Sequence, residues 1–130
     1  MYLRKFLDLY FDLWETLNSK EYQEKHAYRI SLNGSETGRM CITITGRAFS
    51  EKDNEMYGGH RELMQIIKSG SDTWIHYRDY WRSLGFADLG HSEVMRIVTD
   101  YGDCECTYDE VSVNGDYKTS YIRLKEFKYE

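Results

Sequence analysis

The side chains best suited to chemistry in this sequence are its cysteines and histidines. Cys104 and Cys106 are separated by one residue, while His60 and His91 lie elsewhere in the chain. Structural zinc sites usually space paired cysteines two to four residues apart and require a second pair of ligands. On a strand, Cys104 and Cys106 would point to the same side, as two small core residues do. The spacing therefore predicts no metal site.

A catalytic cysteine would need a neighbouring base or a helix N-terminus that favours its thiolate form. Cys41 lies between Met40 and Ile42 in a segment with the alternation of a strand, and no cysteine stands in a known nucleophile motif. The glycine patterns of nucleotide-binding loops are missing as well. We expect no catalytic residue and no cofactor. The alternative is a small hydrolase or transferase that uses His60 or His91 with a cysteine.

Acidic residues are concentrated in one segment near the C-terminus. Residues 97–117 hold six carboxylates and no lysine or arginine, whereas the whole chain has a net charge of −5. An acidic strand flanked by tyrosines fits a basic surface on another protein. The expected partner-binding residues are Asp100, Asp103, Glu105, Asp109, Glu110, Asp116, Tyr101 and Tyr108. The alternative is an edge strand whose like charges oppose aggregation.

The acidic segment also indicates a kind of partner. Enzymes hold nucleic acid in basic clefts, and a small acidic domain can occupy such a cleft by imitating the phosphate backbone. We therefore expect an acidic protein-binding module: a stoichiometric inhibitor or immunity-type protein that blocks a nuclease or another nucleic-acid-handling enzyme, as anti-defence (anti-CRISPR-like) and toxin-immunity proteins do. No basic stripe or RNA-binding motif is present, so direct nucleic-acid binding is not expected.

The cysteine count and the hydropathy of the chain indicate the compartment in which the protein resides. The odd number of cysteines, Cys41, Cys104 and Cys106, favours a reducing environment in which all three are free thiols. Asp8 and Asp12 interrupt the apolar N-terminus, no signal-peptide cleavage site follows, and no stretch reaches the roughly 18 apolar residues of a membrane span. We expect a cytoplasmic protein with no membrane contact, and one domain covering residues 1–130.

The spacing of hydrophobic residues predicts where helices and strands lie along the chain. Apolar residues at helical spacing predict an amphipathic helix from Tyr2 to Asn18, packed on a sheet or serving as the seam of a homodimer or a structural interaction subunit. Alternation predicts one hairpin from residues 28–33 and 40–45. A second hairpin from 104–113 and 117–124 surrounds Asn114-Gly115. Its face parity changes between Tyr108 and Val111, which predicts a bulge or break near Asp109 and Glu110, or one solvated face.

Two segments in the middle of the chain are similar to each other. Residues 59–67 and 90–98 share five of nine positions, and each begins with glycine followed three residues later by glutamate. That pattern predicts two short helices. A further helix is expected over 72–84, capped by Asp72 and lined by Trp74, Tyr77, Trp81 and Leu84. The resulting fold class is α+β: an antiparallel sheet of four or five strands, with the N-terminal helix and two or three short helices packed mainly on one face.

Overall fold

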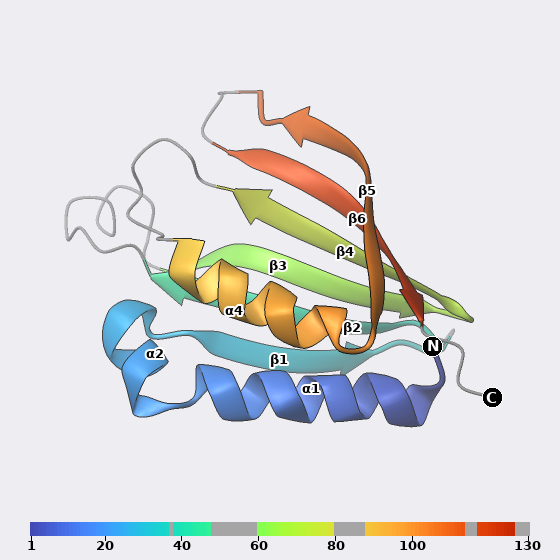
Figure 1. Cartoon of the computed structure of the whole chain (residues 1–130), viewed down its shortest axis with the longest axis horizontal. Helices are drawn as coiled ribbons and strands as arrows, with labels where there is room; N and C mark the ends of the chain where they lie inside the picture. The colour runs from blue at the N-terminus through green and yellow to red at the C-terminus, as the bar shows by residue number, and fades with distance from the viewer. Residues whose placement is uncertain (37, 48–59, 80–87, 114–116, 127–130) are drawn as a thin grey trace.

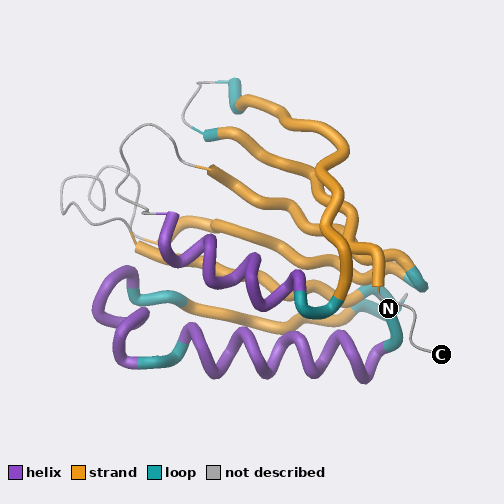
Figure 2. Tube along the Cα trace, viewed as in Figure 1, coloured by secondary structure: helices purple, strands orange, loops and turns teal. Residues whose placement is uncertain are grey.

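A computed structural model describes residues 1–36, 38–47, 60–79, 88–113 and 117–126. In these residues six strands form one antiparallel sheet in the order β1-β2-β3-β4-β6-β5. The helices α1 and α4 lie across one face of it (Figures 1 and 2). The helices are α1 (Leu3–Leu17), α2 (Lys20–His26) and α4 (Asp88–Thr99), and the strands are β1 (Arg29–Gly34), β2 (Met40–Arg47), β3 (His60–Ser69), β4 (Asp72–Asp79), β5 (Gly102–Val111) and β6 (Lys118–Glu126).

Helix α1 confirms the expected N-terminal amphipathic helix. Phe6, Leu9, Leu13 and Leu17 recur at helical spacing and are fully buried against the sheet. Its first turn contains no acid and its last turn no base, so its charges do not stabilise the helix dipole. Packing of the apolar face therefore stabilises α1.

Strand register decides which side chains reach the helices. Cross-strand partners lie on one face of a sheet, and one row of partners crosses all six strands beneath α1 and α4. That row consists of Leu32, Ile42, Ile66, Ile75, Ile122 and Cys106. Ile42, Ile66 and Ile75 are fully buried, whereas Cys106 at the β5 end is exposed. The core therefore lies under the middle of the sheet and thins out toward β5.

The helix expected over 59–67 is wrong: His60–Ser69 is the strand β3, paired with both β2 and β4. Its register skips Leu63, because Ile44 pairs with Met64 and Thr45 with Glu62. This bulge lets the adjacent Leu63 and Met64 both be buried, which simple strand alternation does not allow. The apolar spacing that favoured a helix is thus accommodated by a bulged central strand.

The helix expected over 72–84 is also wrong where the structure describes it, because Asp72–Asp79 is the strand β4. Asp72 is not a helix cap but pairs with Ser69 across a tight turn in which Gly70 has φ +60°. A glycine with positive φ suits a two-residue hairpin turn. These two strands account for a sheet of six strands instead of four or five. Trp81 and Leu84 lie outside the described residues.

The other expected hairpins and helix are present in the structure. Both expected hairpins form, as β1–β2 and β5–β6, and 90–98 is helical within α4. The expected bulge in β5 lies at Thr107, slightly earlier than predicted, because Cys106 pairs with Ile122 and Tyr108 with Tyr121. The short helix α2 was not foreseen. Asn114-Gly115 lies outside the described residues.

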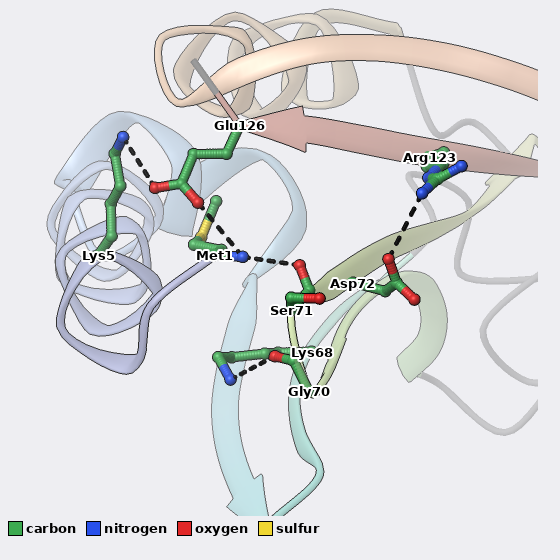
Figure 3. Close-up of polar contacts among 8 residues, drawn as sticks. All are labelled: Met1, Lys5, Lys68, Gly70, Ser71, Asp72, Arg123 and Glu126. Carbon is green, nitrogen blue, oxygen red and sulfur yellow. Dashed lines mark hydrogen bonds and ion pairs between the residues drawn. The ribbon is translucent and has the colours of Figure 1, made fainter. Parts of the chain in front are cut away.

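A polar cluster ties α1 to the sheet (Figure 3). The N-terminal ammonium of Met1 donates a hydrogen bond to the Ser71 carbonyl at 2.8 Å and pairs with Glu126 at 3.3 Å, and Lys5 pairs with Glu126 at 3.1 Å. Burial alone would raise the pKa of Glu126, but hydrogen bonds from Lys5 and the ammonium lower it below the ordinary glutamate value. One carboxylate of β6 therefore holds two cations at the start of the chain.

We predict that Glu126→Gln lowers the free energy of unfolding by about 1 kcal/mol at pH 7. Because the pKa of Glu126 is lowered in the folded state, its carboxylate stabilises the fold at pH values above the glutamate pKa of the unfolded chain, about 4.3. This contribution is lost as the pH falls through the pKa of Glu126 in the folded state. Urea unfolding of wild type and variant should therefore differ at pH 7 and converge near pH 3. Glu36→Gln, an exposed change in the β1–β2 turn, is the control. A deficit of Glu126→Gln that is equal at both pH values would contradict the role of this carboxylate.

Candidate functional site

The sheet face opposite α1 and α4, called the open face below, carries a row of aromatic side chains. Its central row of cross-strand partners is Ser31, Thr43, Gln65, His76, Tyr121 and Tyr108. The His76 and Tyr121 rings meet edge to face with centroids 4.8 Å apart, and Tyr121 stacks on Tyr108 at 4.5 Å. His76, Tyr121 and Tyr108 therefore form a continuous aromatic row across β4, β6 and β5.

Charged and aromatic residues flank the aromatic row on the same face. On one side, Trp74 of β4 pairs in register with Arg123 of β6. On the other side, the Arg78 guanidinium lies 4.9 Å from the centroid of the Tyr117 ring. There the surface is hollowed by about 450 Å³, and the hollow is lined by Arg78, Glu110, Val111, Ser112, Val113, Tyr117, Thr119 and Tyr121.

The aromatic row includes a histidine that is neutral at neutral pH. Burial, then the positive charge of Arg39, lowers the pKa of His76 below its ordinary value. A neutral imidazole can pack edge to face against Tyr121 and still offer a nitrogen to a ligand. The row is thus a largely uncharged strip bordered by charges.

Strand β5 places half of the expected binding residues beside this row. Register and strand alternation put Asp103, Glu105, Tyr108 and Glu110 on the open face. Tyr108 is 56% exposed, and the Tyr121 hydroxyl donates a hydrogen bond to Glu110 at 3.2 Å. β5 pairs only with β6 among the described strands, so these residues border the sheet.

The other expected binding residues lie elsewhere. Asp109 lies on the opposite face of β5, where it accepts hydrogen bonds from Ser120 at 2.6 Å and the Cys106 thiol at 3.5 Å. Tyr101, in the turn between α4 and β5, donates a hydrogen bond to Asp12 of α1, so it helps to hold that helix. Asp100 precedes it in the same turn. Asp116 lies outside the described residues.

Cations on β6 partly neutralise the acids of β5. Lys125 pairs with Glu105 at 2.8 Å and is in register with Asp103. Its hydrogen bond lowers the pKa of Glu105, and the hydrogen bond from Ser120 lowers that of Asp109. Both carboxylates are therefore charged at neutral pH. The surface is nevertheless less acidic than the segment read alone, because Arg123 and Lys125 of the pairing strand lie opposite Glu105 and Asp103.

The cysteines do not meet a histidine in the described residues. Cys104 and Cys106 share one face of β5, while Cys41 lies on the open face beside Ile67. Burial raises the pKa of the Cys104 thiol, and desolvation followed by the hydrogen bond to Asp109 raises that of Cys106. The side chains of His60 and His91 lie outside the described residues. Within the described part, no three metal-ligating side chains gather at one place.

Sequence reasoning missed Trp74, His76, Arg78 and Tyr121 as a group. The first three were assigned to a helix, in which positions two apart do not share a face. The signal for a strand was present: Thr73, Ile75 and Tyr77 alternate with Trp74, His76 and Arg78 after the Gly70-Ser71 turn. On that strand Trp74 and Tyr77 lie on opposite faces, so the aromatic helix face expected from them does not exist.

The chain matches no protein-family model, no curated protein and no solved structure with which it was compared. Of the helices in the described ranges, none has the length and apolar character needed to cross a membrane.

We predict that the purified protein contains three free thiols, because Cys41, Cys104 and Cys106 are all unpaired in the structure. In the native state Cys106 should react first with a thiol reagent, since it alone is exposed. Its rate should rise with pH because the thiolate is the reacting form, and the raised pKa of Cys106 should shift this rise to higher pH than in an ordinary cysteine. Cys106→Ser should remove only this fast phase. Fewer than three thiols after denaturation without reductant, or stoichiometric zinc, would disprove the prediction.

Proposed function

We propose that this protein is a stoichiometric binding module that docks another protein on the β5 side of its open face. The observation that carries the proposal is the placement of a continuous aromatic row next to the exposed acids of an edge strand. Protein interfaces combine an aromatic centre with a charged rim, and their energetically dominant residues are enriched in tryptophan, tyrosine and arginine. The aromatic row and its flanking residues have this composition.

The charges favour a partner with a basic surface. Asp103 and Glu105 lie two residues apart on one side of β5, a spacing of roughly 6.6 Å. Glu110 lies farther along the same face, beyond the bulge at Thr107. Glu105 already forms an ion pair with Lys125 of the same protein, so a basic partner would compete with Lys125 for Glu105. We further propose that the partner is a nuclease or another nucleic-acid-handling enzyme. The support is that basic clefts of such enzymes accept rows of negative charge. In this proposal the protein is an inhibitor or immunity-type protein.

The same geometry does not favour the hydrolase or transferase alternative. A thiol nucleophile acts as its thiolate, and the raised pKa values of Cys104 and Cys106 keep both thiols protonated at neutral pH. Cys41 faces Ile67 and Trp74 across the strands and lies near the Thr43 hydroxyl at 3.6 Å. Its two in-register partners in the described strands, Asn33 and Ile67, are not bases.

We predict that neutralising the open-face acids weakens partner binding with little effect on stability. The triple variant is Asp103→Asn, Glu105→Gln and Glu110→Gln, which keeps side-chain shape and avoids placing lysines opposite Lys125 and Arg123. Charges at an interface rim mainly set the association rate and its salt dependence. The variant should bind several-fold to about tenfold more weakly at low salt and lose most of the salt dependence. Tyr108→Ala should act differently, raising the dissociation rate by about tenfold because it removes a stacked ring from the centre.

The measurement has two stages. Wild type captures its partner from an extract of the native host at two salt concentrations, and the purified pair is then measured by a kinetic binding assay. A matched control, Glu21→Gln with Glu24→Gln and Glu36→Gln, removes the same charge near the β1 edge of the sheet, opposite β5. If the control weakens binding and the β5 variants do not, the proposed surface is wrong. If the captured partner has no nucleic-acid-handling activity, only the narrower proposal about its class fails.

A further inference from the structure

Helix α1 leaves a second apolar surface uncovered by the described part of the chain. Besides its buried face, it carries the exposed Leu3, Phe11 and Trp14 and the half-buried Leu7 and Tyr10, of which Tyr10 also packs against the core. These five residues lie within about 100° of one another at 100° per residue. We call these five residues the α1 ridge. Leu3, Phe11 and Trp14 are 49%, 62% and 48% exposed, so more than an isolated apolar side chain meets solvent here.

The ridge points away from the rest of the described molecule. Asp12 lies on the flank of α1 that reaches Tyr101 in the α4–β5 turn, and the ridge lies on nearly the opposite flank. α1 contacts the edge strand β1. Beside Trp14, a hollow of about 520 Å³ lies between the end of α1 and the strands β1 and β2, with Asn18, Ile30 and Thr43 among its lining residues. The ridge and this hollow together form a surface at the β1 side, remote from β5.

Charges along the ridge suit an antiparallel copy of the same helix. Arg4 lies in the first turn and Glu15 in the last, so each opposes the dipole of its own helix. Both are exposed and lie on the same flank of the ridge, next to Phe11. A two-fold axis at the middle of the ridge, near Leu9, would bring Leu7 opposite Phe11 of a second copy. It would also bring Arg4 within one residue of Glu15 of that copy. Antiparallel helices pair equivalent flanks, so each cation would then meet an acid and the negative end of a helix dipole.

From this self-complementarity we infer that the protein forms a two-fold homodimer through the α1 ridge, with Arg4 of each copy paired to Glu15 of the other. This interaction is separate from the partner binding proposed for β5, because the two surfaces lie at opposite edges of the sheet. The ridge from Leu3 to Trp14 is about 16 Å long, which is short for an interface. The dimer should therefore be weak, with a dissociation constant on the order of 10–100 µM.

Sedimentation of the full chain over a series of concentrations from about 1 µM to about 500 µM tests this inference. The wild-type mass should rise from monomer toward twice the monomer. Arg4→Glu and Glu15→Arg should each raise the dissociation constant by about tenfold, since each places two like-charged pairs in the symmetric interface. The double variant Arg4→Glu with Glu15→Arg should restore dimerisation. Phe11→Asp should abolish it, and Glu36→Lys, a reversal in the β1–β2 turn, should change nothing.

Each variant alters an exposed residue, so circular dichroism should show an intact fold in all of them. Wild type that remains monomeric at every concentration overturns the inference, and a different protein would then be the occupant of the ridge. A dimer that survives Phe11→Asp lies on another face, which also overturns it. Single reversals that weaken the dimer without restoration in the double variant would contradict the antiparallel arrangement.

Discussion

The packing of α1 and α4 on one face of the sheet determines which side chains of the strands are buried and which are available for binding. Phe6, Leu9, Leu13 and Leu17 of α1 and Val94 and Val98 of α4 bury the middle of the sheet from one side. Side chains of the opposite parity are not covered by α1 or α4, and in the described strands all of them except Ile67 are at least partly exposed. A one-residue change of register would exchange the two sets. The bulges at Leu63 and Thr107 are therefore central features: the first keeps two apolar neighbours inside, and the second brings Tyr108 to the accessible face.

Elements with a local sequence signal were predicted correctly, whereas elements stabilised by pairing with distant strands were not. The first helix and both outer hairpins were predicted because their period or turn residues are local signals. β3 and α4 show the limit of such signals, since 59–67 and 90–98 share a pattern but only the second is helical. β3 has a strand on each side, and those partners override its local pattern. The alternation in β4 was a usable signal, but it was outweighed by the expectation that Asp72 caps a helix.

The candidate surface was predicted only in part for a related reason. A charge count along 97–117 finds the acids of β5, but it does not include Arg123 and Lys125, which the hairpin places opposite Glu105 and Asp103. Nor does a charge count show that Asp109 lies on the opposite face of β5 from the other three acids, Asp103, Glu105 and Glu110. The bulge at Thr107 determines which face of the sheet each of these side chains occupies. The aromatic row joins His76 to residues more than thirty positions away, so it exists only after β4 and β6 pair. Sheet pairing changes the expected acidic edge into a mixed surface of aromatic rings and charges.

We propose that a protein partner covers the open face at β4, β6 and β5. This can be tested by hydrogen–deuterium exchange of the protein with and without its purified partner, at concentrations low enough to keep the protein monomeric. We expect slower exchange on binding in 72–79, 102–111 and 118–126, with the smallest change in 3–17. Because β4 and β6 lie within the sheet, their amides should already exchange slowly in the free protein, so the largest change should fall on the β5 amides that do not bond to β6. Slower exchange confined to α1 and β1 would show that the partner binds elsewhere.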